Sequence, residues 1–237
     1  MMKKTGSTIT FCLDIGGTGI KGLTADAADR PTCERVRLET PHPATPDAMI
    51  EVMGEIARQM PRFHRVAAGF PGVVVKGRTL TAPNLDPAWE GFDLAGALEK
   101  LTGKPARVAN DAGVQGLAAV EGEGTELVVT LGTGMGFALY LDGHYVPNIE
   151  MSHHPFRNKK TYEELVGNAA LQEAGKKKWN RRVEKVVEQL ARIFNYHVLY
   201  LGGGNAEKIR FDLPANVKII ENVDGLLGGV KLWQQPG

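Results

Sequence analysis

The segment DIGGTGIKG, Asp14–Gly22, decides how the start of the fold is interpreted. It contains a formal G-x-G-x-x-G pattern and follows a buried-strand pattern over residues 8–15. A dinucleotide-binding fingerprint needs a helix directly after the glycines, because the N-terminus of that helix holds the pyrophosphate. The residues after Gly19 instead alternate like a returning strand. The segment therefore predicts a phosphate-binding hairpin, with the carboxylate of Asp14 at the end of its first strand.

Length and composition limit the classes of function. The chain has 237 residues, of which 43% are hydrophobic and 23% are charged, so it can form one large domain or two modest lobes. Its net charge of +1 gives no global attraction to nucleic acid or to an anionic membrane. No apolar run is long enough to cross a membrane, and the first strand pattern begins too close to Met1 for a DNA-binding helix-turn-helix to precede it. We expect neither nucleic acid nor membrane as a partner.

Cys12 and Cys33 are the two cysteines of the chain. Two thiols cannot form a disulfide framework or, alone, a four-ligand zinc site. The sequence therefore predicts a protein of the reducing cytoplasm.

The rest of the first half alternates between helix and strand patterns. We expect helices at 47–60, 94–101 and 111–120, and strands at 34–40, at 65–70 continuing through 73–75, and at 106–109. This alternation predicts an α/β lobe.

The second half repeats the opening pattern. ELVVTLGTGMG followed by FALYLDG predicts a strand, a glycine corner and a second strand, as at Asp14. A charged helical region at 161–194 has a break near Gly175, and the strand in HVLYLGGG is expected to lead into a helix. A strand at 217–220 and a terminal helix complete the pattern.

Three glycine runs end predicted strands, at Gly16–Gly19, Gly132–Gly136 and Gly202–Gly204. Glycine lets backbone N–H groups approach an oxyanion that side chains would exclude. A tight hairpin without a ligand is the more frequent explanation of a lone glycine corner, and the repetition of the corner favours binding. The chain has no Walker A sequence, so P-loop chemistry is set aside.

Two pairs of polar residues are candidates for catalysis or ligand binding. Asn110 and Asp111 lie between a short strand and a helix, where a carboxylate could act as a base or simply cap the helix. Glu150 and His153 form an E-x-x-H pattern, which is a weak signal on its own and is also typical of solvent-facing residues.

Taken together, the motifs resemble those of the ROK sugar kinases, and particularly their polyphosphate glucokinase branch. The matching motifs occur in family order over nearly the whole chain: LDIGGTGIKG, AGFPGVV, APNLDPAWEGFDL, VANDAGVQGLA, LGTGMG, the E-x-x-H and LGGGN. The resemblance implies an α/β actin-like (ribonuclease-H-like) fold of two lobes with a cleft between them. We place the lobes at 1–112, completed by a C-terminal helix at 224–237, and at 113–223.

The resemblance implies a phosphoryl donor, ATP or polyphosphate, with Mg²⁺ held by Asp14 directly or through water. It assigns to donor binding Asp14, Gly16, Gly17, Thr18, Gly19, Lys21, Gly132, Thr133, Gly134, Gly136, Gly202, Gly203 and Gly204.

The resemblance also implies that Asp111 is the general base that accepts the proton of the attacking sugar hydroxyl. It assigns to sugar binding Asn84, Asn110, Asp111, Glu150, His153 and Glu163. Glu164 competes with Glu163, because the spacing to Gly167 fits either residue.

One feature separates this chain from many family members. The segment after His153 has no cysteine, so we expect no zinc at that histidine. The cation-rich stretch GKKKWNRR, Gly175–Arg182, could follow a long polyanion, although a solvated helix face is the favoured explanation. The hydrophobic positions that follow it predict core, with a dimer interface as the less favoured alternative.

These features predict a hexokinase/glucokinase-type phosphotransferase that converts glucose to glucose 6-phosphate with ATP or polyphosphate. The alternative is a catalytically silent sugar-binding or regulatory protein on the same scaffold. The choice of hexose and of donor stays open, and so does a homodimer.

Overall fold

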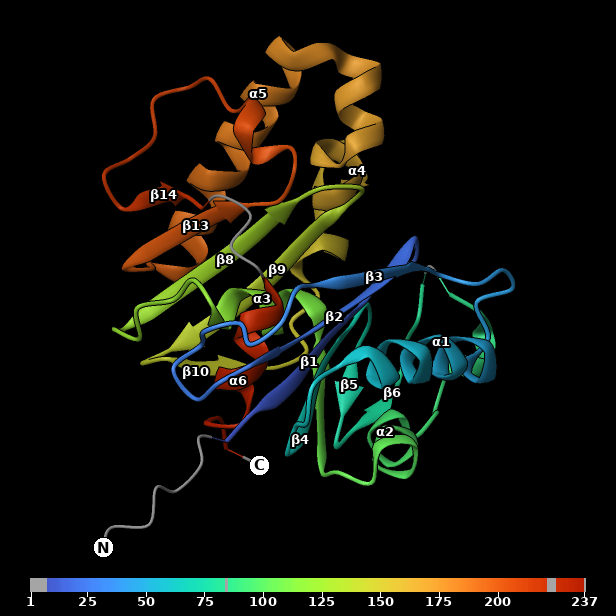
Figure 1. Ribbon diagram of the computed structural model, residues 1–237. Coiled ribbons are helices and arrows are strands. Elements are labelled where there is room, and N and C mark those ends of the chain that lie inside the picture. Colours follow the sequence, from blue (N-terminus) through green and yellow to red (C-terminus); the bar gives the residue numbers. More distant parts are fainter. Residues whose placement is uncertain (1–7, 84, 221–224, 237) are drawn as a thin grey trace, which may run out of the picture. The chain divides into compact units, whose positions relative to one another are not determined.

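The computed structural model describes residues 8–83, 85–220 and 225–236 (Figure 1). Contacts divide the chain into two compact units, Met1–Ala118 with Asp224–Gly237, and Ala119–Val223. The division falls six residues after the expected boundary at 112, because the helix that begins at Asp111 packs on the first sheet.

The first unit is built on a mixed five-stranded sheet of order β3-β2-β1-β4-β7. β1 and β2 form an antiparallel hairpin, while β1, β4 and β7 run parallel. The expected strand-turn-strand corner is therefore confirmed. The strands of this sheet are β1 (Thr10–Ile15), β2 (Gly19–Ala25), β3 (Val36–Glu39), β4 (Arg65–Phe70) and β7 (Ala106–Asn110).

The expected continuation of β4 through 73–75 is wrong. β5 (Val74–Val75) pairs with β6 (Arg78–Thr79) in a separate two-stranded sheet. Pro71 has no N–H to donate to the larger sheet, and a side chain at Gly72 would collide with the carbonyl of Thr81. The chain therefore leaves the sheet directly after β4.

Helices cover both faces of the first sheet (Figure 1). α1 (Pro46–Gln59) begins at the cap Thr45, whose hydroxyl accepts from the N–H of Ala48, and it packs its buried side chains against β2 and β3. The remaining helical elements of the unit are η1 (Pro87–Trp89), α2 (Leu94–Thr102), α3 (Asp111–Leu117), η4 (Gly225–Leu227) and α6 (Gly228–Leu232).

The C-terminal segment is fixed to the first sheet by an aromatic ring. The guanidinium groups of Arg65 and Arg107 lie 5.1 and 4.9 Å from the centroid of the Trp233 ring, and the indole N–H donates to the carbonyl of Val66. Arg107 also donates to the carbonyls of Leu232 and Gln235. These contacts hold α6 on the face that it shares with α3.

The second unit repeats the strand order and directions of the first. Its sheet has the order β10-β9-β8-β13-β14, with β8 antiparallel to β9 and parallel to β13. The echo seen in the sequence is thus a repeated structural unit. The strands are β8 (Thr125–Leu131), β9 (Met135–Leu141), β10 (His144–Val146), β13 (Val198–Gly202) and β14 (Val217–Ile219), with a separate pair β11 (Pro155–Arg157) and β12 (Lys160–Thr161).

The helical elements of the second unit differ in part from expectation. The expected break is confirmed at Gly175, whose φ of 74° and ψ of 158° interrupt α5. The helix expected after Gly204 is wrong, because only a single 3-10 turn follows. The elements are η2 (Met151–His153), α4 (Tyr162–Val166), α5 (Asn168–Phe194) and η3 (Ala206–Lys208).

The described residues contain no helix that is both long and apolar enough to cross a membrane. Cys12 is buried in the first unit and Cys33 is half-buried, and neither forms a disulfide. Burial raises the pKa of the Cys12 thiol to about 12, so this thiol stays protonated at neutral pH.

Candidate active site

The corner Gly16–Gly19 joins β1 to β2 in the first unit. The N–H of Gly16 donates to the carbonyl of Gly19 at 3.1 Å, and the hydroxyl of Thr40 donates to the carbonyl of Gly16. A side chain at Gly16 would meet the Gly19 carbonyl at 2.9 Å. The first glycine thus closes the corner, which leaves its tip at Gly17 and Thr18 partly exposed.

Asp14 and Lys21 lie opposite each other on β1 and β2 and form an ion pair of 2.7 Å. The side chain of Asp14 is 16% exposed and that of Lys21 is 36% exposed. The carboxylate therefore lies at the base of the corner with one oxygen paired to an ammonium.

Asp111 lies on the same face of the first sheet as Asp14. Gly69 of β4 is the register partner of Asp14 on the neighbouring strand. A Cβ built on Gly69 would lie 3.1 Å from the Cα of Asp111 and 3.6 Å from its Cβ. Because Gly69 has no side chain, the two aspartates flank one bare backbone position at the carboxyl edge of the parallel strands.

Asn110 connects the end of β7 to the start of α3. Its Oδ1 accepts from the N–H of Gly113 at 3.2 Å, and its Nδ2 donates to the carbonyl of Gly72 at 3.2 Å. Oδ1 of Asp111 accepts from the N–H of Ala112 at 2.7 Å. Asn110 is therefore the helix cap, and the residue beside it is oriented by the first turn of the helix. Asn84, the other predicted amide, lies outside the described residues.

The second corner, Gly132–Gly134, joins β8 to β9. The N–H of Gly132 donates to the carbonyl of Gly134 at 3.0 Å, which repeats the closure of the first corner over a shorter span. The N–H of Asn168, at the start of α5, donates to the carbonyls of Gly132 and Thr133. The joint between α4 and α5 thus supports this corner.

The third glycine run is folded against the second corner. Gly203 has a φ of 83°, and a Cβ there would lie 2.5 Å from the carbonyl oxygen of Leu131. The backbone N–H of Asn205 donates to the same carbonyl at 2.9 Å, and its side chain donates to the carbonyl of Gly132 at 3.2 Å. The third glycine run therefore packs against the end of β8, and Asn205, just after the run, binds the second corner.

Glu163 and Glu164 are distinguished by their partners. A Cβ on Gly134 would lie 2.7 Å from the carboxylate of Glu163, so that carboxylate rests against the second corner. Glu164 instead forms a capping box with Thr161 at the start of α4. Hydrogen bonds from the backbone and side chain of Thr161 hold the pKa of Glu164 below its usual value. The geometry favours Glu163 as the group available to a ligand.

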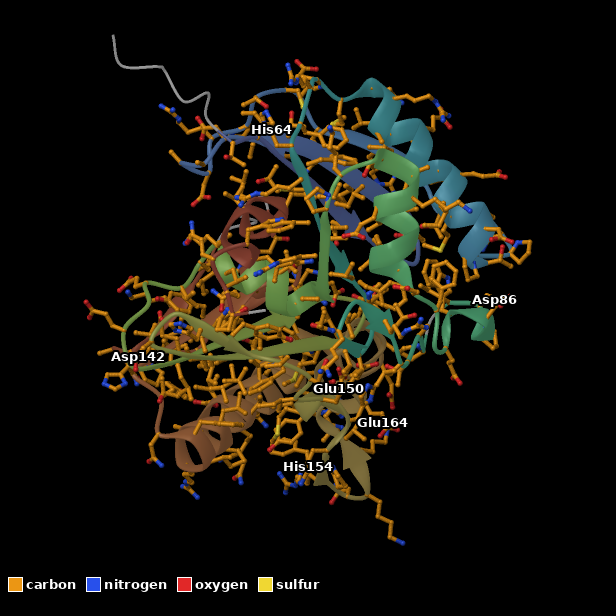
Figure 2. All side chains as sticks on the ribbon, turned by 90° about the horizontal axis from the view of Figure 1, so that it is seen from below. His64, Asp86, Asp142, Glu150, His154 and Glu164 are labelled. Atoms are coloured by element: carbon orange, nitrogen blue, oxygen red, sulfur yellow. The ribbon has the colours of Figure 1, made fainter. Side chains whose placement is uncertain are left out.

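Glu150 and His153 lie close together at the short turn η2. The imidazole Nε2 of His153 is 3.6 Å from Oε2 of Glu150, and both side chains are exposed. η2 packs against β9 and α4, and Figure 2 shows Glu150, His154 and Glu164 in this region of the second unit. The E-x-x-H pair is therefore placed beside the helix that carries Glu163.

The cation-rich stretch separates into buried and exposed residues. Trp179 is fully buried and donates its indole N–H to the carbonyl of Val166 at 2.7 Å, whereas Lys176, Lys177 and Lys178 are exposed. The tryptophan belongs to the core, as do Val183, Val186, Val187 and Leu190. This arrangement agrees with a solvated helix face.

Few side chains near the first corner are suited to bind a metal ion. In the residues that the structure describes, no group of three or more His, Cys, Asp or Glu side chains is placed to hold a metal ion. Mg²⁺ is commonly bound by one or two carboxylates together with substrate phosphates and water. Asp14, beside the first corner, fits that mode of binding as a single protein ligand.

Comparison with known proteins identifies the family. A model of the ROK family matches residues 10–149, which include both glycine corners and the aspartates that flank Gly69. The chain belongs to the ROK family.

Individual relatives extend this similarity beyond the matched region. A polyphosphate glucokinase of Mycobacterium tuberculosis is 28% identical over 236 residues, covering 92% of this chain and 88% of the relative. An N-acetylmannosamine kinase of Citrobacter koseri is 32% identical over 140 residues, covering 56% of this chain and 48% of the relative. The crystal structure of an inorganic polyphosphate/ATP-glucomannokinase from Arthrobacter sp. strain KM is 28% identical, has a TM-score of 0.85, and is matched over 97% of this chain and 100% of its own. The ROK chain therefore has the actin-like α/β fold that its motifs imply.

Sequence reasoning missed three residues that shape the corners of this ROK protein. Arg37 and Thr40 reach the first corner from the strand β3 and the residue after it, and Asn205 reaches the second corner. The alternation of polar and apolar residues in VRLE placed Arg37 on a polar face. Only the pairing of β3 with β2 shows that this face borders the corner.

Proposed function

We propose that this ROK protein transfers a phosphoryl group from polyphosphate or ATP to the 6-hydroxyl of glucose. It is a phosphotransferase of the hexokinase/glucokinase type, as its similarity to polyphosphate glucokinase over 92% of the chain indicates. One observation carries the detailed proposal: Asp14 and Asp111 flank Gly69 on one face of the sheet, beside a glycine corner. Phosphoryl transfer needs a charged group near the donor and a base near the acceptor.

The first corner is assigned to the donor. The backbone N–H groups of the partly exposed residues Gly17 and Thr18 would approach phosphate oxygens, and Lys21 supplies positive charge next to Asp14. Magnesium, when bound with the donor, would neutralise charge on the phosphate oxygens. The residue that would hold it here is Asp14.

Asp111 is assigned as the general base. Its carboxylate would accept the proton of the sugar hydroxyl as that oxygen attacks phosphorus. The hydrogen bond from the N–H of Ala112 fixes one carboxylate oxygen, which orients the group. Asn110, together with Asn84, would hold neighbouring sugar hydroxyls.

The second unit is assigned further sugar contacts from Glu163, Glu150 and His153. Glu163 is preferred over Glu164 because the capping box already engages Glu164. The amides of Gly132–Gly136 and of Gly202–Gly204 would contribute to binding of the donor. Catalysis would then come mainly from positioning and from neutralisation of charge, as expected for a loose phosphoryl-transfer transition state.

A coupled assay tests this proposal. Glucose, mannose and N-acetylmannosamine are each combined with ATP and with polyphosphate, in Mg²⁺ and in excess chelator. We expect glucose 6-phosphate to form, and to form only when Mg²⁺ is present. Sugar binding by calorimetry without turnover for any pair would instead identify a silent sugar-binding protein.

A further inference from the structure

Arg37 lies against the tip of the first glycine corner. On β3 it is the register partner of Lys21, which is in turn the partner of Asp14 on β1. Directly opposed residues of antiparallel strands project from the same face of a sheet. The side chains of Asp14, Lys21 and Arg37 therefore form one row across three strands.

The guanidinium of Arg37 covers Gly19 and reaches the backbone of the corner. Its terminal nitrogen donates to the carbonyl of Thr18 at 3.2 Å. A Cβ built on Gly19 would lie 2.7 to 2.9 Å from three atoms of the guanidinium. Glycine at position 19 therefore leaves the space in which the guanidinium lies.

The charges of this row do not cancel. Lys21 is paired with Asp14 at 2.7 Å, whereas no carboxylate of the described residues forms an ion pair with Arg37. Arg37 is exposed, and a guanidinium carries five N–H donors, of which the carbonyl of Thr18 takes one. The row of Asp14, Lys21 and Arg37 thus carries a net positive charge, and Arg37 keeps surplus donors. Glu39, which is opposite Gly19 on the same face, forms no ion pair with Arg37 among the described residues.

We propose that Arg37 binds a phosphate of the donor that is not itself transferred. This proposal rests on the proposed function of the first corner and adds a specificity-determining residue to it. The planar fork of arginine fits two oxygens of a phosphate, and its hydrogen bond to Thr18 fixes the direction of the fork. The corner would then grip the donor with backbone on one side and a guanidinium on the other.

The competing explanation is that Arg37 only stiffens the corner through the carbonyl of Thr18. That role requires a hydrogen-bond donor but not a charge. Glutamine retains an N–H donor and removes the charge, while lysine retains the charge without the planar fork. Arg37→Gln and Arg37→Lys therefore separate the two roles.

The experiment measures both binding and kinetics. Inorganic tripolyphosphate is titrated into the wild type, Arg37→Gln and Arg37→Lys by calorimetry, and Michaelis constants are measured for donor and for glucose. Arg62→Gln is the matched control, since it removes an exposed arginine of the same unit away from the corner.

We expect Arg37→Gln to weaken tripolyphosphate binding and to raise the KM for donor by about tenfold, as for loss of a charge-assisted hydrogen bond. Arg37→Lys should recover part of this loss, and the KM for glucose should change less than about twofold in either variant. The salt dependence of tripolyphosphate binding should also become shallower in Arg37→Gln.

Tripolyphosphate affinity and donor KM within about twofold of wild type in Arg37→Gln would overturn the proposal. Equal increases in the KM for donor and for glucose would also overturn it, because they indicate a general distortion of the corner. The titration needs no turnover, so a wild type that binds tripolyphosphate but phosphorylates no sugar would contradict the proposed function and leave the role of Arg37 supported.

Discussion

The two glycine corners have the same backbone construction and different surroundings. Each joins the first two strands of a five-stranded sheet, and the two sheets have matching order and directions. The corner Gly16–Gly19 is bordered by the cations Lys21 and Arg37. The corner Gly132–Gly134 is supported by backbone N–H groups and faces the carboxylate of Glu163.

This difference is consistent with the proposed roles of the side chains beside each corner. The cations Lys21 and Arg37 suit the polyanionic donor, whereas a carboxylate suits a neutral sugar, because it can accept a hydrogen bond from a sugar hydroxyl. In the proposed function the backbone amides of both corners contribute to donor binding, whereas the side chains beside them meet different ligands, the donor at the first corner and the sugar at the second.

Among the variants that test the comparison of the two corners, the largest effect is expected at Asp14, at the base of the first corner. Asp14→Asn removes the charge proposed to face magnesium and leaves Lys21 without its anionic partner. We expect kcat/KM to fall by about 10² to 10³-fold, in the range found when an electrostatic catalytic group is removed. Steady-state kinetics with either donor measures this loss.

Asp47→Asn is the control for Asp14→Asn. It removes an exposed aspartate in the first turn of α1, and activity should stay within about twofold of wild type. Equal activity of the Asp14 and Asp47 variants would mean that the two corners do not differ in the way proposed.

The next effect tests the support of the second corner. Gly203→Ala places a Cβ 2.5 Å from the carbonyl oxygen of Leu131 and forces a φ of 83° on alanine. We expect the free energy of unfolding to fall by about 2 to 4 kcal/mol, measured by urea denaturation. Gly132→Ala is the matched variant, because a Cβ there meets nothing within 4 Å, and it should cost about 1 kcal/mol or less. Equal losses would show that the packing of Gly203 against Leu131 does not support the corner.

A smaller effect, on Michaelis constants, tests whether the sugar or the donor binds next to Glu163. Glu163→Gln removes a hydrogen-bond acceptor beside Gly134, and we expect the KM for glucose to rise by about tenfold. The KM for donor should change less than about twofold, the reverse of the result expected for Arg37→Gln. A rise in donor KM alone would place the donor, and not the sugar, next to this carboxylate.

The smallest effect is expected at Glu164, the residue that follows Glu163. Glu164→Gln weakens the capping box with Thr161 and should lower Tm slightly without changing either KM. The pKa of Glu164 is lowered in the folded protein, so its contribution to stability is present above its unfolded pKa and is lost as pH falls through the folded value. The difference in Tm between wild type and variant should therefore disappear in acid. A pH-independent difference would contradict this assignment.

Local patterns in the sequence predicted most of the elements of the fold. The hairpin after Asp14, its repeat after β8 and the break at Gly175 all follow from strand alternation and glycine placement. The errors lie where tertiary contacts, and not local sequence, decide the local structure. Gly72 packs closely against the carbonyl of Thr81, and the chain leaves the first sheet at this point. The residues after Gly204 bind the second corner and form no long helix.

The site was predicted less completely, for a related reason. Motif spacing identified glycines and acids that follow one another in sequence, but it could not show that Gly69 separates Asp14 from Asp111. Likewise Arg37 reaches the corner through strand pairing. Residues that act across strands leave no signal in local spacing.

The role of Asp111 as the base is tested most directly by pairing turnover with sugar binding in Asp111→Ala, with Asp111→Asn as a closer match in shape. We predict that phosphorylation of glucose falls by about 10³-fold or more, while the affinity for glucose measured by calorimetry stays within about threefold of wild type. Phosphorylation within about tenfold of wild type in a variant that still binds glucose would contradict the account.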